Sequence, residues 1–478
     1  MRRTTPFELT LEERPRYVGL SRWLHEQLRQ AILSGRLPAG VRLPASRDFA
    51  LQYGLSRGTV VGVFEQLEAE GFLRGRRGFG TWVNQLPESS HRTKKFEPTV
   101  VKLPSPLTGL SFPQPAPAFR SHEPALDEFP MAEWSRLTSR CLRRASTSLL
   151  AQRDARGHPQ LRKALAEYLG VSRGVNCNAD QIVIVTGIQQ ALDILARVLL
   201  KARDSVWMED PGYFGAVTAF RNAGAKIVPV PVDNEGLSVS AGKELGPRAK
   251  GVYLTPAHQF PLGVMMTLNR RLEILAWAQS RGAFVIEDDY DGIYRLAGRP
   301  IPTLQSMDKN ESVILIGSFN KILFPALRIG YMVLPQRLAD AVVPFRFGLD
   351  QNTVGLEQSV LAEFIERGHL GRHIRRTRDL YSERLAIFRS LSKRHLEGLM
   401  EISNTQAGLY TVGLLENGMT SREAEEAALK SGVETMALDR FRLRRKTPHG
   451  LLLGFAPFDR RAMEVGIRKL ATALSGRR

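Results

Sequence analysis

Apolar positions near the N-terminus repeat at the spacing of an amphipathic helix. The first such helix, over residues 18–33, has an apolar face made by Leu20, Trp23, Leu24, Leu28 and Ile32. Glycines and capping residues then predict a second helix that starts at the N-cap Ser46 and a third over residues 57–70 that follows the N-cap Ser56. Two short strands, over 72–74 and 81–83, come next.

A basic, glycine-rich tip over residues 75–80 joins these two strands. Helix, turn, helix and hairpin in this order predict a winged helix-turn-helix domain, which we expect over residues 14–84. A phosphate-binding loop is the alternative for the tip, but the tip has no strand-to-helix context of the kind such a loop needs. Prolines among serines, threonines and lysines then predict an extended linker over residues 85–120.

Beyond the linker, apolar strands alternate with helical segments. The expected strands are 181–185, 205–208, 226–231, 251–254, 283–286, 313–316 and 329–334. This alternation predicts an α/β domain over residues 121–478 with a mostly parallel sheet. We expect a large lobe over about 121–355 and a small α+β lobe over about 356–478.

The 478 residues carry a formal net charge of +19, with a pI of about 10.2, which favours an anionic partner such as nucleic acid, an anionic membrane or a phosphorylated ligand. No apolar run approaches the ~18 residues of a membrane span, and no apolar core follows Arg2 and Arg3, so neither a membrane segment nor a signal peptide is predicted. Cys141 and Cys177 form neither a disulfide framework nor a zinc site, which suits a reducing cytoplasm.

Every fixed positive charge in the predicted head is an arginine, whose planar side chain suits phosphates and guanine edges. The start of the third helix is expected to enter the major groove, and the wing to reach phosphate or the minor groove. The expected DNA-binding residues are Arg47, Ser56, Arg57, Gly58, Thr59, Arg76 and Arg77.

A lone lysine, Lys321, follows the apolar run 313–316 at the mouth of the predicted sheet. Lysines are rarely placed there for stability, and desolvation lowers the pKa of an amine and makes it a nucleophile toward aldehydes. Ser318 and Arg328 lie on the same loop and would hold a phosphate. The alternative for this stretch is a lysine on the surface.

The acidic stretch Glu287 to Asp291 ends another strand. Strand alternation places Asp288 and Tyr290 on one face, with Glu287 and Asp289 on the other. Asp288 would keep a pyridinium nitrogen protonated, and Tyr290 would bind the phenolic oxygen of the ring. A divalent-metal cluster is the alternative for these carboxylates.

Two further loops converge on the same chemistry. Ile188 and Gln189 open a helix after a strand, so their free N–H groups suit a phosphate. Tyr213, in the loop 209–213, could stack on a flat ring. Together the loops predict a site for pyridoxal 5'-phosphate, with Lys321 as the catalytic residue that holds the aldehyde as an internal aldimine.

The head closely resembles the GntR family of bacterial transcription regulators, and the residues that match lie at 35–40, 43–47, 55–60 and 67–73. The large region resembles aminotransferases of fold type I at 187–192, 209–213, 255–263, 287–291 and 319–321. With both parts, the chain resembles the MocR subfamily from end to end. The resemblance implies a multidomain chain in which a winged helix-turn-helix head is joined to an α/β domain of the type I pyridoxal-phosphate-dependent transferase fold.

The resemblance also implies partners. It implies a double-stranded DNA operator, and a cofactor that senses a small-molecule effector: an amine, an amino acid or a B6 vitamer. It implies a head-to-tail homodimer in the bacterial cytoplasm, with no membrane partner.

Two positions and one strand depart from the pattern of the family. Asn320 stands where members usually carry serine, and Gln152 where they usually carry a tyrosine that reaches a phosphate across the dimer. The strand 451–455 is apolar, whereas aminotransferases often carry there an arginine for the substrate carboxylate. An ordinary α-amino acid is therefore not implied as the ligand.

These features predict a cofactor-dependent, ligand-responsive transcription regulator. One alternative is an active aminotransferase with a non-regulatory head, which steady keto-acid production would indicate. The other is a DNA-binding protein whose large domain only dimerises, which a colourless protein insensitive to borohydride would indicate.

Overall fold

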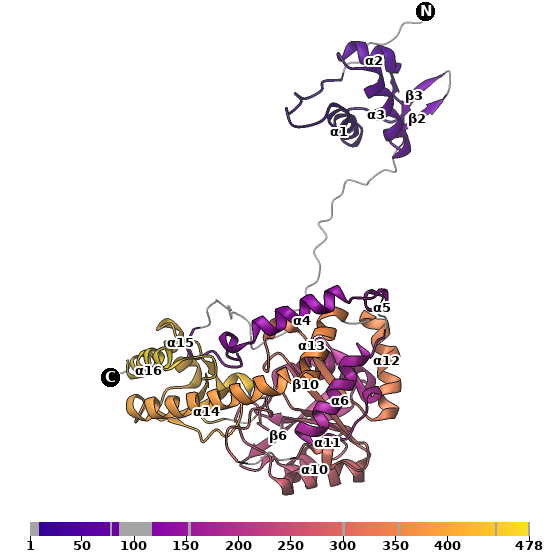
Figure 1. Ribbon diagram of the computed structural model, residues 1–478. Coiled ribbons are helices and arrows are strands. Elements are labelled where there is room, and N and C mark those ends of the chain that lie inside the picture. Colours follow the sequence, from indigo (N-terminus) through magenta and orange to yellow (C-terminus); the bar gives the residue numbers. More distant parts are fainter. Residues whose placement is uncertain are drawn as a thin grey trace, which may run out of the picture. The chain divides into compact units, whose positions relative to one another are not determined.

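The computed structural model describes residues 9–76, 79–85, 117–151, 154–298, 302–351, 354–444 and 447–476 (Figure 1). They belong to two compact units, one before and one after the boundary between Leu103 and Pro104. Within the described ranges, every helix is either too short or too polar to traverse a lipid bilayer.

The first unit combines three helices with a small antiparallel sheet. Its elements are α1 (Leu20–Leu33), β1 (Arg42–Leu43), α2 (Ser46–Gln52), α3 (Arg57–Ala69), β2 (Leu73–Arg76) and β3 (Gly80–Val83). The strands pair in the order β1-β3-β2. Leu24, Leu28, Phe49, Val63 and Leu67 are buried together between the helices. The order of these elements confirms the predicted winged helix-turn-helix.

The starts of the second and third helices differ in how they are capped. The prediction that Ser46 caps α2 is wrong: α2 begins at Ser46 itself, and the extended Ala45 before it is the N-cap, without a side-chain bond. Ser56 does cap α3, since its Oγ accepts a hydrogen bond from the Thr59 N–H at 3.1 Å. This bond satisfies one of the otherwise free amides at the helix start.

The second unit is built on an eight-stranded sheet in the order β4-β11-β10-β9-β8-β5-β6-β7. Its strands are β4 (Ile182–Val185), β5 (Ser205–Asp210), β6 (Lys226–Asp233), β7 (Gly236–Leu237), β8 (Gly251–Leu254), β9 (Phe284–Asp288), β10 (Val313–Ser318) and β11 (Gly330–Val333). The pairs from β10 through β6 are parallel, whereas β11 runs antiparallel to β10 and β4. The predicted, mostly parallel sheet is confirmed.

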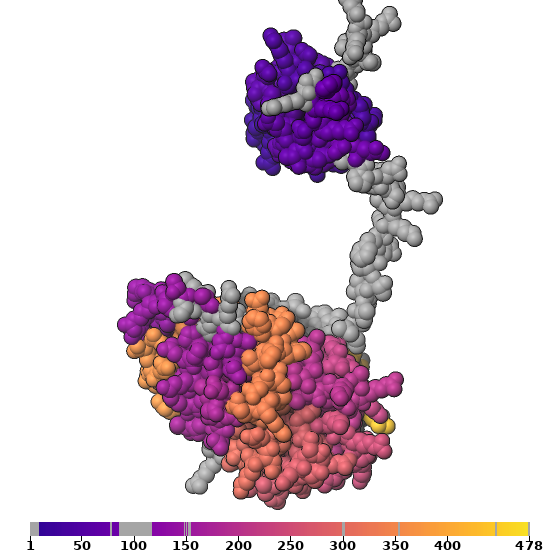
Figure 2. Space-filling view, turned by 90° about the vertical axis from the view of Figure 1, so that its right-hand side faces the viewer, coloured from indigo at the N-terminus to yellow at the C-terminus, as the bar shows by residue number. Residues whose placement is uncertain are grey.

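Helices lie between and around these strands. They are α4 (Met131–Arg143), α5 (Thr147–Leu150), α6 (Pro159–Arg173), α7 (Ile188–Leu199), α8 (Phe214–Asn222), α9 (Val239–Leu245), α10 (Leu268–Arg281), α11 (Leu304–Met307), α12 (Gln336–Asp350) and α13 (Gly355–Glu366). Although α13 lies far along the chain, it packs on α4 and α6. Figure 2 shows the same junction, where the orange surface of the later helices adjoins the purple surface of the earlier ones.

A smaller antiparallel sheet in the order β12-β13-β15-β14 carries the C-terminal part of the unit. Its elements are α14 (His369–His395), β12 (Met400–Ile402), β13 (Tyr410–Leu415), α15 (Ser421–Lys430), β14 (Met436–Ala437), β15 (Gly450–Gly454) and α16 (Arg460–Ser475). Phe119 is buried against this part, and Arg120 forms an ion pair with Glu434 at 2.8 Å. Residues 118–120, expected at the end of the linker, therefore pack on the second unit.

Strand register brings two functional loops together. Asp288 ends β9 and lies beside Ile316 of the parallel strand β10. Ser318 ends β10 two residues later, so the loop that carries Lys321 leaves the sheet at the same edge as Asp288. Because carboxyl ends of adjacent parallel strands share one edge, the predicted site residues meet there.

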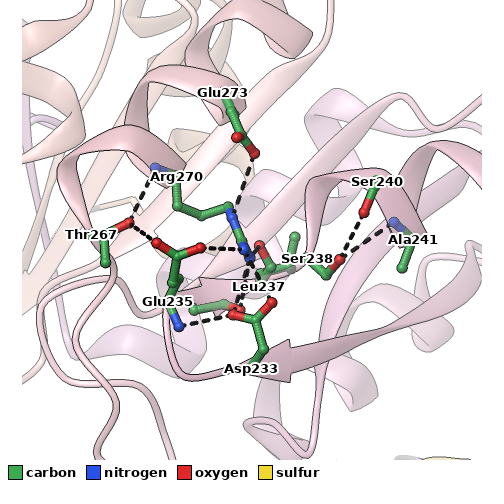
Figure 3. Close-up of polar contacts among 10 residues, drawn as sticks. Asp233, Glu235, Leu237, Ser238, Ser240, Ala241, Thr267, Arg270 and Glu273 are labelled. Carbon is green, nitrogen blue, oxygen red and sulfur yellow. Dashed lines mark hydrogen bonds and ion pairs between the residues drawn. The ribbon is translucent and has the colours of Figure 1, made fainter.

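A third loop, over residues 255–266, is fixed at its base by Arg271 in the first turn of α10. Arg271 donates to the carbonyl oxygens of Pro256 at 2.8 Å and Met266 at 3.2 Å. Arg270 lies among the carboxylates of Asp233, Glu235 and Glu273, as Figure 3 shows. The two Arg271 contacts hold the loop that brings His258 and Phe260 to the site.

Candidate cofactor site and DNA-reading head

The eight residues predicted to bind the cofactor line one cavity of about 500 Å³ in the second unit. They are Ile188, Gln189, Tyr213, Asp288, Tyr290, Ser318, Lys321 and Arg328. They come from the ends of β9 and β10, from the loop between β10 and β11, and from the starts of α7 and α8. The first of them, Ile188, and the last, Arg328, are more than one hundred residues apart in the sequence, so only the folded sheet brings them together.

Lys321 is the cavity's amine. Its side chain is half-buried, and Nζ lies 4.0 Å from the centroid of the Tyr290 ring. Burial lowers the pKa of Lys321 below its ordinary value, and the carboxylates of Asp291 and Asp288 oppose that shift. The lowered pKa makes the neutral, nucleophilic amine more accessible than on an exposed lysine.

Asp288 supplies a carboxylate with one oxygen in use and one unpaired. The Tyr253 hydroxyl donates to Oδ2 at 2.7 Å, whereas Oδ1 is buried and has no hydrogen-bond partner. Burial raises the pKa of Asp288 to about 7, and the Tyr253 hydrogen bond and Lys321 act in the opposite direction. A buried acceptor without a donor is costly. The N–H of a protonated pyridine ring would satisfy it, so this residue fits a pyridoxal cofactor.

Asp288→Asn should raise the melting temperature of the aldehyde-free protein by about 2–6 °C at alkaline pH, because the variant removes a buried charge and keeps an acceptor for Tyr253. The carboxyl has a pKa of about 7 in the folded protein against an ordinary 3.8, so the unfolded chain loses this proton first. The buried carboxyl of Asp288 therefore lowers the free energy of unfolding of the wild type increasingly as pH rises from about 4 to about 7, and by a constant amount above that.

Melting curves recorded between about pH 5 and pH 8 check this expectation. The advantage of the variant over the wild type should shrink as pH falls through about 7. A difference that does not change with pH would contradict the raised pKa of Asp288.

The neighbouring carboxylates face other partners. Glu287 accepts hydrogen bonds from the backbone N–H groups of Leu304 and Gln305, both at 2.9 Å, and lies 3.7 Å from Arg271. Asp289 forms a buried ion pair with Arg173 at 2.8 Å. The carboxylates therefore alternate between faces, as the strand pattern predicts, and the described residues contain no group of three or more side chains suited to a metal ion.

A buried polar network lies behind Tyr290. The Tyr290 hydroxyl is 3.1 Å from His258 Nδ1 and 3.1 Å from the Tyr410 hydroxyl, and His258 Nδ1 is also 2.9 Å from Asp291 Oδ2. Burial raises the pKa of Tyr290 well above its ordinary value, with Asp291 adding to the shift. The phenol therefore stays protonated. A Cβ at Gly408 would collide with His258 and Asp291, so the network also depends on a glycine.

Sequence reasoning missed three residues that contact the site: Asp291 and Tyr410 in this network, and Tyr253 beside Asp288. Asp291 lies in the acidic stretch, but the sequence analysis gave it no role. It follows the end of β9, where the alternation of strand faces no longer predicts the direction of a side chain. Tyr410 and Tyr253 lie on other strands, and their apolar surroundings in the sequence gave no signal either.

The N-terminus of α7 and Arg328 mark the anion-binding end of the cavity. Gly187, the N-cap of α7, makes no side-chain cap bond, so its position leaves the first helical amides facing the cavity. Arg328 adopts a left-handed backbone with φ of 52° and forms no hydrogen bond or ion pair with the described residues. Ser318 Oγ accepts from the Asn320 N–H at 3.1 Å. A phosphate would meet a helix dipole and a guanidinium here.

Tyr213 forms one wall of the cavity. It is the N-cap of α8, and its ring centroid lies 5.9 Å from that of Phe260 and 6.5 Å from that of Tyr253. Its hydroxyl donates to Gln189 Oε1 at 3.5 Å. The ring therefore has a fixed position from which it could stack on a flat ligand.

In the first unit, most of the predicted DNA-binding residues are on the surface. Arg47, Ser56, Arg57, Gly58 and Arg76 are exposed, and Thr59 is half-buried beside Ser56. Arg77 lies outside the described residues, as does Gln152. The tip that Arg76 begins joins two antiparallel strands rather than a strand and a helix, which agrees with a wing and not with a phosphate loop.

Ser56→Ala should destabilise the first unit by about 1 kcal/mol, because α3 loses its only side-chain cap. The free energy of unfolding is measured by chemical denaturation, either of the isolated N-terminal unit or of the full chain with the fluorescence of that unit as the signal. Ser46→Ala is the matched control and should have little effect, since the Ser46 side chain does not cap α2.

The comparisons with known proteins agree with both units. Residues 124–427 match the family of aminotransferases of classes I and II, and residues 20–83 match the gntR family of bacterial regulatory proteins. The second unit is similar to the α-aminoadipate aminotransferase LysN of Thermus thermophilus, solved in complex with N-(5'-phosphopyridoxyl)-L-leucine. The TM-score is 0.69 at 28% identity, covering 75% of this chain and 92% of that one.

Relatives of full length combine the same two parts. The chain is 38% identical to the probable rhizopine catabolism regulatory protein MocR of Rhizobium meliloti, over 95% of this chain and 94% of the relative. It is 29% identical to the pyridoxine biosynthesis transcriptional regulator PdxR of Corynebacterium glutamicum, over 95% of each.

Fold and site together define a transcription regulator in which a winged helix-turn-helix head is fused to a unit of the pyridoxal-phosphate-dependent aminotransferase fold. Relatives over the full length narrow this class. The chain belongs to the MocR subfamily of GntR-type transcription regulators.

Proposed function

We propose that the second unit holds pyridoxal 5'-phosphate on Lys321 and uses it to sense a small-molecule effector that changes DNA binding by the head. The observation that carries this proposal is the half-buried Lys321 amine in the same cavity as the unpaired Asp288 Oδ1. When bound, this cofactor supplies an electrophilic aldehyde that reacts with primary amines. The solved LysN complex with a phosphopyridoxyl adduct supports the assignment for this fold.

Each predicted residue has a task in this proposal. Asp288 Oδ1 would accept the ring N–H, the Tyr290 hydroxyl would face the phenolic oxygen, and Tyr213 would stack on the ring. The phosphate would accept hydrogen bonds from the N–H groups of Ile188 and Gln189 at the start of α7. The side chains of Ser318 and Arg328 would bind it as well. His258 and Asp291 would hold the Tyr290 hydroxyl in place.

In the head, Arg57, Gly58 and Thr59 would enter the major groove of an operator, with Arg47 and the wing arginines Arg76 and Arg77 on the backbone. The exposed arginines on this unit and the net charge of +19 support an anionic partner. The relatives named as regulators support the same role. We place the protein in the bacterial cytoplasm as a head-to-tail homodimer, in which an effector acts by binding one conformation better than another.

The experiment uses the full-length chain loaded with pyridoxal 5'-phosphate. An operator is first selected from random duplexes, and its affinity is measured by fluorescence anisotropy with and without a panel of amines. At least one amine should change both the visible absorbance of the cofactor and the affinity for the operator. The sensing role would be refuted if no amine that changes the absorbance of the cofactor also changes the affinity of the loaded protein for the operator.

A further inference from the structure

One side of the cavity has an aromatic and apolar wall. Phe260 and Phe441 line it, with ring centroids 4.8 Å apart, and His122 packs on Phe260 at 5.2 Å. Met436, at the edge of the small sheet, lines it as well. Behind these side chains, Tyr410 and Val412 complete a buried apolar cluster. A charged group placed against this wall would lose its hydration without gaining a partner.

The described lining of the cavity contains two side chains that are cationic near neutral pH, and the proposed function uses both. Among the described residues that line it, Lys321 and Arg328 are the only lysine and arginine. His122 is no substitute, because burial lowers its pKa well below the ordinary value, with Lys321 adding to the shift, and the ring is neutral near pH 7. Lys321 would hold the aldehyde and Arg328 the phosphate. No described cation in the lining is left for a carboxylate.

Nearby arginines of the small lobe face elsewhere. Arg440 forms an ion pair with Glu425 at 2.7 Å, and Arg442 and Arg444 are exposed and do not line the cavity. The backbone that carries them is fixed by Asp210, whose carboxylate accepts hydrogen bonds from the N–H groups of Leu443 and Arg444.

Leu452, on the small sheet, lies directly behind this wall. On β15 it pairs with Val412 on one side and with Met436 on the other. Strand alternation sends Leu451 and Leu453 into the main core, whereas Leu452 is fully buried in the cluster with Phe260, Tyr290 and Phe441, all three of which line the cavity. A longer side chain at this position would therefore reach toward the effector.

Resting on the proposed function, we propose that the effector is a primary amine that carries no carboxylate, and that the aromatic wall, with the apolar Leu452 behind it, excludes amino acids. The amino group is required by the aldehyde on Lys321. The rest of the effector meets apolar and aromatic surface, so an uncharged body is favoured. A carboxylate there would find no counter-ion among the described residues of the lining, which disfavours its binding.

The test compares amines with the amino acids from which they differ by a carboxylate alone. The pairs are phenethylamine and L-phenylalanine, isobutylamine and L-valine, isopentylamine and L-leucine, and ethanolamine and L-serine. Each is titrated into the full-length protein loaded with pyridoxal 5'-phosphate, and binding is read by visible absorbance and by calorimetry. In at least one pair the amine should act at a concentration at least about tenfold lower than its amino acid. If no amine is favoured over its partner, the inference is overturned.

Two variants locate the selectivity. Leu452→Arg should improve the apparent affinity for amino acids at least about tenfold, because it supplies the missing counter-ion. Leu452→Met introduces an unbranched side chain without a charge, and it should keep the preference of the wild type. A folded Leu452→Arg protein with unchanged preferences would overturn the assignment to this wall. If Leu452→Arg does not fold, the ranking of the wild-type pairs still decides the inference.

Failure of this inference differs from failure of the proposed function. Borohydride treatment of the loaded wild-type protein, before any amine is added, tests whether the aldehyde is on Lys321. Absence of that label removes the proposed function. Presence of the label, together with amino acids that act as well as amines, removes only the inference about the effector.

Discussion

Replacing Lys321 by alanine should abolish both covalent capture of pyridoxal 5'-phosphate and the response of DNA binding to effector. The reason is that the described lining of the cavity offers no second lysine that could take over the aldehyde. Operator binding itself should remain within about threefold of the wild type, because Lys321 belongs to the second unit and the reading head has its own core. Absorbance, borohydride labelling and anisotropy measure the three effects.

Lys309→Ala is the matched control for this experiment. Lys309 is exposed and does not line the cavity, so its removal should leave capture and response unchanged. A Lys321→Ala protein that still responds fully to effector would contradict the sensing role of the cofactor. Steady keto-acid production by the wild type from an amino donor would indicate instead that the unit works as an aminotransferase.

Replacing Arg57 by alanine should weaken operator binding by roughly 1–3 kcal/mol and relax the preference for one base pair. Arg57 is the first residue of α3 and is exposed, so its guanidinium is free to reach a base edge when the helix start enters the major groove. Anisotropy with the selected operator, and with single-base variants of it, measures both the loss and the base position that depends on Arg57.

The control here is Arg22→Ala. Arg22 is an exposed arginine on α1 that we do not assign to the DNA contact, so the variant removes the same charge from the same unit. It should reduce affinity less than Arg57→Ala and equally for all sequences. Equal losses in the two variants, with unchanged base preference, would exclude Arg57 from direct reading.

Much of the candidate cofactor site could be predicted from local sequence because most of its residues lie at or just after the ends of strands. Alternation along β9 separates Asp288 from Glu287 and Asp289, and the structure places the last two against Arg271 and Arg173, on the opposite side from the cavity. Parallel pairing of β9 with β10 then brings Lys321 to the same edge. These are short-range rules of strand geometry, which a single sequence expresses directly.

What the sequence did not reveal depends on contacts between distant segments. Tyr410 reaches Tyr290 across 120 residues, and Arg173 reaches Asp289 across 116. The strand β1 consists of two residues and forms only because Arg42 and Leu43 pair with β3. No local pattern predicts such partners, because burial and pairing are decided by the packed fold rather than by propensity.

The acidic stretch shows how the two levels combine. In sequence its carboxylates also allowed a metal site, since such ions prefer oxygen ligands in a dense group. In the structure two of the carboxylates are bound by arginine side chains and backbone amides, one keeps a free oxygen in the cavity, and Asp291 contacts His258. Four neighbouring acids thus serve separate tasks.

The most direct test of the central claim is to identify the atom that captures the aldehyde. The protein is purified with pyridoxal 5'-phosphate in excess, reduced with borohydride, digested and mapped by mass spectrometry. We predict one phosphopyridoxyl group per chain, on Lys321. A label on any other lysine, or no label at all, would contradict the account.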